Sequence, residues 1–557
     1  MQPRRYSAWP AELPHSLVVP QTPLHYNLEV SARRYPDKPL AVFYDSPLSY
    51  AQAWRETEAL AGYLRQRCGV RRGDRVLLLM QNSPQFIIAY YAILRADAMV
   101  VPVNPMNLTE ELRHYVDNAG TATAIVGQEI YPQLHPLLGA GQLAHVIVAT
   151  YSDYLRAESA FRTPESCLAP REACTDAGAI AWQDALDLRL APAPSQAGPD
   201  DLCVMPFTSG TTGLPKGCIH THATVMFTAV AGAVWFRSIP DTVVLATLPF
   251  FHVTGMQGSM NSPIYMGSTV ILMQRWDRET AARLIEHHRV NSWTNISTMA
   301  IDFLANPALG NHRLGSLTRI GGGGAAMPEA VAQKLKDLTG LNYIEGYGLS
   351  ETIAPTHINP TDRPKKQCLG IPIFDTDARV VEPGTSREVA TGEVGEILSR
   401  GPQVFKGYWR NPEATAAAFV QHDGETFFRT GDLGRVDEDG YFFMVDRLKR
   451  MINAAGYKVW PAEVETILYR HPDVQEACVI GTPDAARGET VKALVVLKAG
   501  RAGDVSPEEI IGWARENMAA YKIPRVVEFV DRLPKSATGK VLWRSLQERE
   551  FATAVPT

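Results

Sequence analysis

The stretch TSGTTGLPKG (208–217), which directly follows the apolar run LCVMPF (202–207), is the most informative part of this chain. Its glycines allow the backbone to approach an anion closely, and its four hydroxyl side chains and Lys216 can donate to phosphate oxygens. The stretch is not a Walker A loop, because Pro215 rather than glycine precedes Lys216. A flexible surface turn is the ordinary alternative for such a loop. Ten residues of this composition directly after an apolar strand favour a phosphate-binding loop instead.

The sequence before this stretch alternates between strand and helix signals. RVLLLM (75–80), MVVPVNP (99–105) and AIVG (124–127) are short apolar runs typical of buried strands. Between them, Ser83-Pro84 predicts a helix start, and Asn107-x-x-Glu110 resembles a capping box. Helix-like and strand-like segments alternate again after residue 446. The alternation predicts an α/β protein with a substantially parallel sheet, divided into a large domain (1–446) and a small one (447–557).

Composition and charge exclude several classes of protein. The 557 residues are 45% hydrophobic and 20% charged, which is ordinary for a globular chain of more than one domain. The net charge of −5, without a basic excess, gives no reason to expect a nucleic-acid partner. Seven cysteines without a C-x-x-C pair argue against a disulfide framework and fit a reducing compartment. No apolar run reaches the ~18 residues of a membrane span, so we expect no transmembrane segment and a cytoplasmic location.

Six further motifs follow the 208–217 stretch in a fixed order. They are LPFFH (248–252), GGGGAAMPE (321–329), GYGLSE (346–351), RTGDLG (429–434), DRLKRMINAAGYKVWPAEVE (446–465) and PKSATGK (534–540). Together the motifs resemble those of the adenylate-forming superfamily, and the resemblance covers roughly residues 25–545. The part after Arg447 looks most like fatty acyl-CoA ligases. The resemblance implies a large N-terminal domain of layered sheets and helices and a small, mobile C-terminal α+β domain.

In this family, a carboxylate attacks the α-phosphate of ATP to give acyl-AMP and pyrophosphate, and a thiol then attacks the acyl-AMP. The resemblance therefore implies ATP, Mg²⁺ and CoA as ligands. It assigns Glu351 to Mg²⁺, Tyr347 to adenine, and Asp432 with Arg447 to the ribose. Ser350 would contact the α-phosphate, where many relatives have threonine. The full set implied to bind ATP or AMP is Thr208, Ser209, Gly210, Thr211, Thr212, Gly213, Lys216, Gly324, Ala325, Ala326, Gly346, Tyr347, Gly348, Ser350, Asp432, Arg447 and Lys540.

Catalysis is assigned by the same resemblance to Lys540, Glu351 and His252. Lys540 would enter the site to stabilise the adenylation transition state, and its surroundings also resemble a site for a lysine acetyltransferase. His252 would lie beside the substrate carboxylate, although a structural histidine is an equal alternative. The stretch Ala455, Gly456 and Tyr457 resembles the loop that lines the CoA tunnel, and Asp446 occupies the position of the hinge between the two domains.

The acyl pocket is expected to be apolar, and no basic residue is evident for a second carboxylate. We expect it to be lined by Phe227, Trp235, Phe236, Met256, Trp293, Met299 and Phe303. This favours a medium- or long-chain fatty acid, while an aromatic acid stays open because apolar pockets discriminate weakly between shapes of similar size. Met256 stands where some long-chain enzymes carry a gating tryptophan.

Several alternatives remain at this point. A carrier-loading acyl-AMP ligase would share every nucleotide motif, and a homodimer is possible. The pairs His220/His222 and His287/His288 lack acidic or cysteine partners at ligand spacing, so we interpret both as structural or surface residues rather than a metal site.

Overall fold

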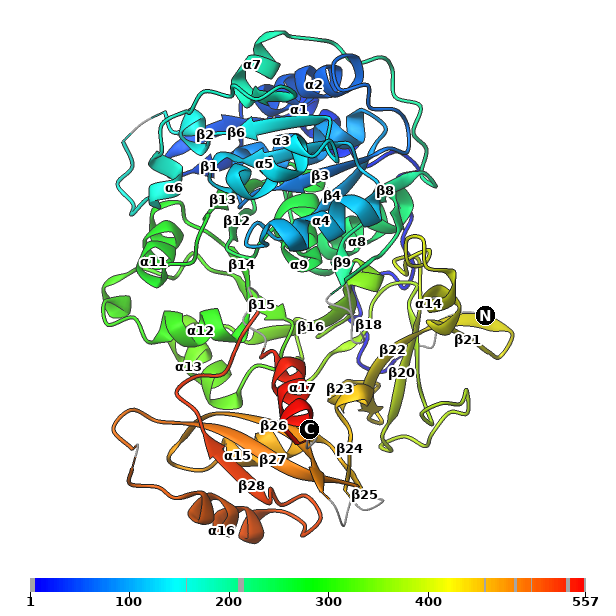
Figure 1. The fold of residues 1–557 in the computed structure, drawn as a ribbon, viewed down its shortest axis with the longest axis vertical. Coiled ribbons are helices and arrows are strands. Elements are labelled where there is room, and N and C mark those ends of the chain that lie inside the picture. Colours follow the sequence, from blue (N-terminus) through cyan, green and yellow to red (C-terminus); the bar gives the residue numbers. More distant parts are fainter. Residues whose placement is uncertain are drawn as a thin grey trace.

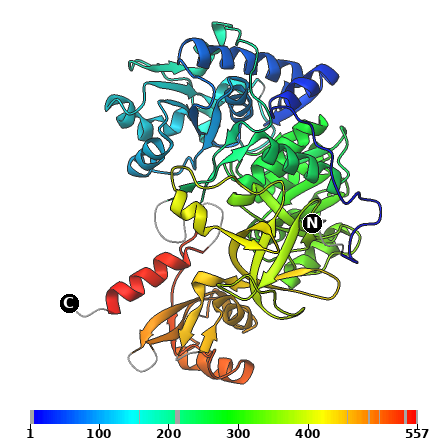
Figure 2. The ribbon, with the colours of Figure 1, turned by 90° about the vertical axis from the view of Figure 1, so that its right-hand side faces the viewer.

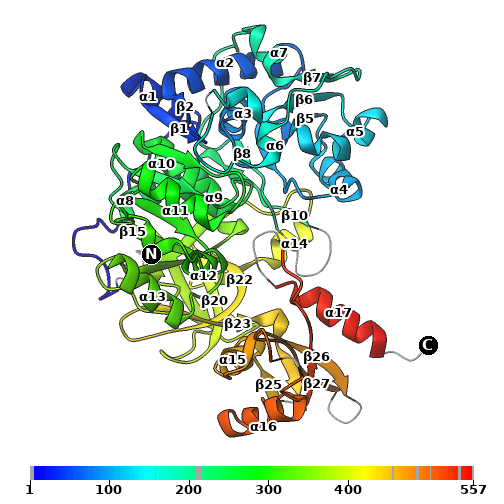
Figure 3. The ribbon, with the colours of Figure 1, turned by 90° about the vertical axis from the view of Figure 1, so that its left-hand side faces the viewer.

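The computed structural model describes residues 6–156, 158–208, 215–454, 457–484, 488–501, 503–536 and 541–554. Figure 1 shows the N-terminal elements in blue and cyan at one end, the green elements in the middle, and the orange and red elements at the other end. Figures 2 and 3 show from two further sides that the C-terminal elements gather at this end and that α17 extends to one side of them.

The first sheet has seven strands in the order β11-β8-β4-β3-β5-β6-β7, and the β4 to β7 side of it is parallel. Its strands are β3 (Arg75–Leu79), β4 (Met99–Pro102), β5 (Thr123–Gly127), β6 (His145–Ala149), β7 (Ala179–Ala181), β8 (Leu202–Val204) and β11 (His220–Thr221). The three apolar runs predicted as strands are therefore β3, β4 and β5, side by side in one parallel sheet.

The second sheet has nine strands in the order β18-β17-β16-β15-β14-β12-β13-β1-β2. They are β1 (Pro39–Phe43), β2 (Ser46–Ser49), β12 (Val243–Ala246), β13 (Thr269–Leu272), β14 (Ser292–Asn295), β15 (Arg319–Gly323), β16 (Tyr343–Leu349), β17 (Ala354–Ile358) and β18 (Ile371–Pro372). Between β8 and β11 along the chain, β9 (Phe207–Thr208) pairs with β10 (Lys216–Gly217), so the predicted phosphate loop begins and ends on a two-stranded ribbon.

One hydrophobic core joins these two sheets. It takes side chains from one face of the first sheet, such as Val76 and Ile125, and from the second, such as Leu245 and Val270. Helix α3 is buried from Pro84 to Leu94 within this core, which explains why its sequence is apolar on all sides. The other helices of this part are α1 (Tyr26–Arg34), α2 (Tyr50–Gln66), α4 (Thr109–Ala119), α5 (Tyr131–Gly139), α6 (Glu165–Leu168), α7 (Trp182–Asp187), α8 (His222–Trp235), α9 (Val253–Met256), α10 (Ser262–Met266), α11 (Arg278–His287), α12 (Ser297–Leu304) and α13 (Glu329–Thr339).

The remaining strands form two further sheets. The first contains β19 (Asp377–Val381), β20 (Gly395–Arg400), β21 (Phe419–His422), β22 (Glu425–Val436) and β23 (Phe442–Arg447), with α14 (Pro412–Ala417) beside it. The second contains β24 (Ile452–Ala454), β25 (Tyr457–Val459), β26 (Val474–Asp484), β27 (Gly488–Leu497) and β28 (Val526–Phe529), with α15 (Pro461–Leu468), α16 (Pro507–Asn517) and α17 (Trp543–Ala554). This C-terminal unit has a hydrophobic core of its own. The predicted boundary at residue 446 falls in β23, just before the chain changes sheets, and the division into 1–446 and 447–557 stays a prediction.

Helix starts were predicted well where a hydroxyl side chain caps the helix. Ser83 accepts a hydrogen bond from the Phe86 N–H at the start of α3, as predicted. The capping box expected at Asn107 is wrong by one residue, because α4 begins at Thr109 and Glu111 accepts from the Leu108 N–H instead. Within the part of the chain that the structure describes, no helix is long and apolar enough to cross a membrane.

Candidate active site

A cavity of about 2670 Å³ lies between the large part of the molecule and the C-terminal unit. Its wall includes Tyr347 and Asp432 from the large part and Trp460 and Trp543 from the C-terminal unit. Most of the sequence motifs that the structure describes contribute residues to this one cavity, so their chemistry is brought together.

The GGGG motif forms strand β15 and the turn after it, not a mobile loop. A Cβ atom on Gly322 would lie 1.8 Å from the Asn295 carbonyl oxygen, and one on Gly323 would lie 2.3 Å from the Gly346 carbonyl oxygen. Both strands beside β15 therefore approach so closely that only glycine fits. Gly324 follows with a φ of 89°, a conformation that favours glycine, and lines the cavity together with the two alanines after it.

Three predicted nucleotide-binding residues meet at Asp432, and we call them the Asp432 cluster. The Tyr347 hydroxyl donates to Asp432 Oδ2 at 2.6 Å, and Arg447 Nε lies 3.2 Å from Asp432 Oδ1. Burial raises the pKa of the Tyr347 phenol well above its usual value, so this group stays a donor. The Tyr347 ring packs against the His357 ring in a tilted arrangement, with ring centres 5.6 Å apart. The cluster presents an aromatic face beside a carboxylate, which suits a base with a ribose.

A second group, the Glu351 cluster, consists of Glu351, Tyr408 and Lys216. The Tyr408 hydroxyl donates to Glu351 Oε1 at 2.8 Å, and Lys216 Nζ lies 5.1 Å from the centre of the Tyr408 ring. Burial raises the pKa of Glu351, while the hydrogen bond from Tyr408 acts in the opposite direction. The chain just after Glu351 is strained, since Ile353 has a φ of 43° and Ala354 a φ of 76°. Such strain is typical of functional sites. Here it lies directly after Glu351, whose carboxylate oxygens are hard ligands.

Two buried side chains hold these segments in place, and the first of them, Glu345, was missed by the sequence analysis. Glu345 is buried and accepts hydrogen bonds from the backbone N–H groups of Met327 at 2.8 Å and Cys368 at 3.3 Å. His220 is buried with Nε2 at 2.8 Å from the Ser350 carbonyl oxygen, and burial lowers its pKa to about 4. Glu345 directly precedes the GYGLSE motif, which was the only signal for it in the sequence. The neighbouring His222 accepts from the Leu24 N–H, so this histidine pair is structural, as interpreted from the sequence.

The predicted acyl-pocket residues separate into two groups. Met299 and Phe236 line the cavity, as does His252 at the start of α9. Five others are not among the described residues that line it and are packed in the core instead: Phe227, Trp235, Met256, Trp293 and Phe303. Trp235 packs against Trp9, and Trp293 stacks on Trp276. The assignment of these five to the pocket is corrected, because a large apolar side chain looks the same in the sequence whether it fills a core or lines a pocket.

The sequence analysis found no evident basic residue for a second carboxylate, but one basic side chain does reach the cavity. Arg319, the first residue of β15, lines the cavity. Its guanidinium carbon lies 4.1 Å from the centre of the Phe236 ring and its Nη2 donates to the Ser292 hydroxyl. Burial lowers its pKa to about 10, so the side chain is charged at neutral pH. Burial alone accounts for this shift, with no contribution from a carboxylate of the described residues.

Asp446, the predicted hinge, is buried and caps a helix of the C-terminal unit. Its Oδ2 accepts from the Ala462 N–H at 2.7 Å, in the first turn of α15, where the N-cap residue Trp460 offers no acceptor. Its Oδ1 accepts from the Arg447 N–H at 2.6 Å and lies 3.9 Å from Arg450 Nη1. Burial raises the pKa of this carboxyl group. Asp446 therefore connects the last strand of the large part to the first helix of the C-terminal unit.

Several predicted residues lie outside the described part of the chain: Ser209, Gly210, Thr211, Thr212, Gly213, Ala455, Gly456 and Lys540. Thr208 and Lys216, on either side of the first group, are paired across β9 and β10. Tyr457 is described as a backbone position in β25. Ser536 and Val541, which flank the segment with Lys540, both line the cavity.

The arrangement defines a nucleotide-binding enzyme in which an aromatic residue, a carboxylate and a glycine-lined wall share one cavity. Comparison with known proteins supports the same class. A family model described as "AMP-binding enzyme" matches residues 28–409, and one described as "AMP-binding enzyme C-terminal domain" matches residues 463–540. The chain therefore belongs to the AMP-binding enzyme family, and the predicted membership of the adenylate-forming superfamily is confirmed.

Among curated proteins, the chain is 36% identical to a long-chain-fatty-acid–CoA ligase of Bacillus subtilis over 97% of both chains. It is 35% identical to a feruloyl-CoA synthase of an Amycolatopsis species, over 90% of this chain and 94% of that one. Among solved structures, it superposes on the anthranilate CoA ligase AuaEII in complex with anthranoyl-AMP with a TM-score of 0.83 at 26% identity, over 97% and 99% of the two chains. The predicted mixed α/β fold with a large N-terminal and a small C-terminal part is confirmed by this similarity.

Proposed function

We propose that this protein is an AMP-forming acyl-CoA ligase that acts on a long-chain carboxylic acid. A carboxylate oxygen attacks the α-phosphorus of ATP, the bond to the β-phosphate oxygen breaks, and pyrophosphate leaves. The CoA sulfur then attacks the acyl carbon of the acyl-AMP, the anhydride C–O bond breaks, AMP leaves, and the thiol proton passes to solvent. The observation that carries the proposal is the position of the Asp432 and Glu351 clusters beside the glycine wall of one cavity.

Each cluster has a separate role in the first step. The Tyr347 ring stacks on adenine, and Asp432 accepts hydrogen bonds from the ribose hydroxyls while Arg447 supports it. Lys216 neutralises phosphate charge, which in this chemistry is stabilised by positioned charges rather than by covalent catalysis. The Glu351 carboxylate lines the cavity and fits a magnesium ligand, since Mg²⁺ prefers oxygen donors. When bound, Mg²⁺ would supply further positive charge to the triphosphate.

We assign Lys540 to this first step. Residues on both sides of Lys540, Ser536 and Trp543 among them, line the same cavity as the Asp432 cluster. This supports an orientation of the C-terminal unit in which Lys540 acts on the α-phosphate and the attacking carboxylate. The second step would need a rotation about Asp446 that brings the Ala455–Gly456–Tyr457 stretch to the CoA path.

Two acid classes fit the cavity. A long-chain fatty acid is the first choice, because a relative named long-chain-fatty-acid–CoA ligase matches nearly the whole chain. Met299 and Phe236 also give the cavity an apolar surface. A phenolic aromatic acid is the second, because Arg319 places a half-buried cation beside the Phe236 ring, where an aromatic ring with a polar substituent would find both partners. A feruloyl-CoA synthase also stands among the relatives.

Three predictions about partners and location rest on the sequence alone. They are a homodimer, acetylation of Lys540 by a lysine acetyltransferase, and a cytoplasmic location. Acetylation would remove the charge that we assign to adenylation and would therefore lower acyl-AMP formation.

A panel of acids tests the proposal. Acetate, octanoate, palmitate, benzoate, cinnamate and ferulate are each supplied with ATP, Mg²⁺ and CoA, and AMP release and thioester formation are measured. We expect CoA-dependent AMP release to be fastest with the long-chain acids. Fastest turnover of ferulate would favour the aromatic-acid ligase. Formation of acyl-AMP without a CoA thioester, together with loading of an added acyl carrier protein, would favour the carrier-loading alternative.

Lys540→Ala tests the assignment of the half-reactions. We expect it to abolish pyrophosphate release but to leave thioester formation from supplied acyl-AMP and CoA largely intact. Lys498→Ala is the control in the same C-terminal unit, because Lys498 is exposed and is not among the described residues that line the cavity. Equal loss of both half-reactions in Lys540→Ala would contradict the assignment.

A further inference from the structure

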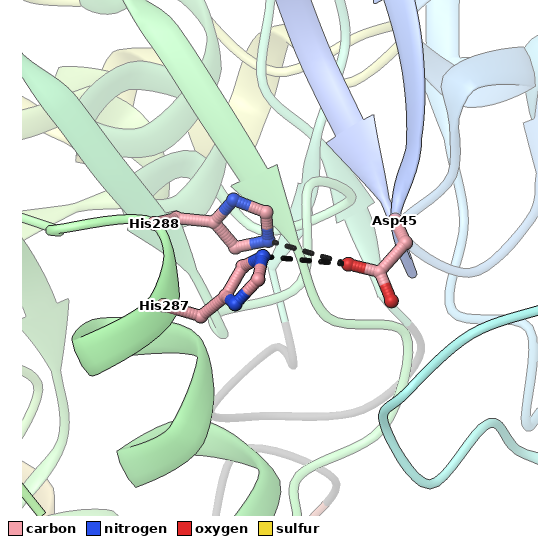
Figure 4. A group of neighbouring side chains, drawn as sticks. All are labelled: Asp45, His287 and His288. Atoms are coloured by element: carbon pink, nitrogen blue, oxygen red, sulfur yellow. Dashed lines mark ion pairs between the residues drawn. The ribbon is translucent and has the colours of Figure 1, made fainter.

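A group of possible metal ligands lies outside the cavity, at the C-terminal end of α11. His287 and His288 end this helix, and Asp45 lies in the tight turn between β1 and β2. Figure 4 shows both imidazole rings directed toward the Asp45 carboxylate. His287 Nε2 lies 3.9 Å and His288 Nε2 4.0 Å from the same oxygen, Asp45 Oδ1. From the sequence we interpreted His287 and His288 as structural or surface residues, because no acidic partner stands at ligand spacing along the chain; the fold brings Asp45 to them.

The Asp45 carboxylate is held so that one oxygen faces the histidines. Its other oxygen, Oδ2, accepts hydrogen bonds from the Ala160 N–H at 2.9 Å and from the Ser159 hydroxyl at 3.2 Å. The turn presents this side chain through a left-handed backbone, with φ of 43° at Tyr44 and 67° at Asp45. Hydrogen bonds to the second oxygen of a ligating carboxylate are the usual means by which proteins orient such a ligand.

The two imidazole rings are also held in place. The Phe161 ring packs against His287 and His288, with ring centres 5.4 and 5.8 Å away. His288 Nε2 is buried and has no hydrogen-bond partner among the residues that the structure describes. The His287 side chain is 60% exposed, so one side of the group is open to water. An unpaired buried nitrogen next to a fixed carboxylate is costly unless something else satisfies it.

We propose that Asp45, His287 and His288 bind a divalent transition-metal ion of the zinc class, with water completing the coordination. Two imidazole nitrogens and one carboxylate oxygen suit Zn²⁺ and its neighbours rather than Mg²⁺ or Ca²⁺, which prefer oxygen alone. Bonds of roughly 2.0–2.2 Å in a tetrahedral site place the donor atoms about 3.3–3.5 Å apart. Side-chain rotations that bring the two imidazole nitrogens about half an ångström closer to Asp45 Oδ1 would reach these distances, and the donor atoms of the three residues already lie within 4.8 Å of one another.

A second group of neighbouring histidine and acidic side chains is less suited to binding a metal ion. Glu388, His422 and Asp423 also lie close together. Both nitrogens of His422 are already paired, with the Ser386 carbonyl oxygen at 2.8 Å and Glu388 at 3.1 Å, and Arg379 forms an ion pair with Glu388. A metal ion there would compete with existing hydrogen bonds and a neighbouring cation, so His422 serves as a control.

The test measures Zn²⁺ affinity of the metal-free full chain by competition with a chromophoric chelator. We expect the wild type to retain Zn²⁺ in the presence of excess Mg²⁺. Asp45→Asn and His287→Gln should each lower the affinity at least tenfold, whereas His422→Gln should leave it unchanged. Asparagine tolerates the left-handed backbone of residue 45, and His287 is half-exposed, so both variants should fold, which circular dichroism checks. Unchanged affinity in both variants, or no retained Zn²⁺ in the wild type, would overturn the proposal.

Co²⁺ provides a second measurement that needs no variant. Bound to two imidazoles and a carboxylate, Co²⁺ should give visible d–d absorption bands that disappear when Zn²⁺ displaces it. Because none of the three ligands is among the described residues lining the active-site cavity, the bands should persist when ATP is added. Absence of the bands would contradict the site. Loss of the bands when ATP is added without Mg²⁺, after correction for the Co²⁺ that free ATP chelates, would contradict its separation from the active site.

Discussion

Two substitutions at Asp446 separate the capping of α15 from the proposed rotation of the C-terminal unit. Asp446→Ala removes the acceptor of the Ala462 N–H and a neighbour of Arg450 but leaves the backbone torsions free. A capping acceptor is worth about 0.5–2 kcal/mol, which corresponds to a factor of roughly 2–30 in population. We expect Asp446→Ala to slow pyrophosphate release about 2–30-fold, because fewer molecules hold α15 in the orientation that serves adenylation.

Asp446→Pro removes the same side chain, fixes φ at about −65° and deletes an N–H group from β23. Pyrophosphate release should therefore fall as in the alanine variant. Thioester formation from supplied acyl-AMP and CoA should stay near the wild-type rate in Asp446→Ala and fall roughly tenfold or more in Asp446→Pro if the torsions at this residue absorb the rotation. The two half-reactions are measured separately on both variants. The same rate of thioester formation in both would refute the hinge and leave Asp446 with a capping role only.

Three further predictions concern the cavity and the fold. Tyr347→Phe should raise the KM for ATP roughly 10–100-fold, since hydrogen bonds to a charged group are worth about 1.5–3 kcal/mol, whereas Tyr343→Phe, whose hydroxyl reaches a neutral amide oxygen, should not. Arg319→Met should shift the ratio of kcat/KM for palmitate over ferulate upward by roughly tenfold, and an unchanged ratio would remove Arg319 from the pocket. Burial lowers the pKa of His357 to about 3, below its value near 6.5 in the unfolded chain, so the unfolded state binds the proton first and stability is lost as the pH falls below about 6.5. Urea melts at pH 7 and 5 should show this loss, and His357→Phe should reduce it.

The nucleotide side of the site could be predicted from the sequence because its residues are fixed by short motifs. Tyr347, Asp432 and Arg447 come from three motifs, and the structure brings them into one cluster. Their partners could not be found this way. Tyr408 is an ordinary tyrosine in the sequence, and only the fold brings its hydroxyl to Glu351.

The acyl side could not be predicted, for a different reason. Burial in a core and exposure to an apolar pocket select the same side chains, so Trp235 and Met299 could not be told apart by composition. Arg319 was overlooked because a basic residue at the start of a strand is ordinary, and its position under Phe236 depends on how β15 packs. The fold class, in contrast, rests on alternation over a long stretch, which is why β3, β4 and β5 were placed correctly.

The close contacts of β15 also limit how the substrate range of this protein can change. At Gly322 any side chain would collide with the Asn295 carbonyl oxygen, and Gly323 is equally confined by Gly346. Substitution of either glycine would disrupt the sheet before it reshaped the pocket. We therefore expect neither natural variation nor engineering to change the substrate range through these two positions. New acids would have to be admitted by changes elsewhere in the lining, such as at Met299 in α12, at Phe236 directly after α8 or at Arg319. A library for altered specificity should vary these three positions and leave the glycines untouched.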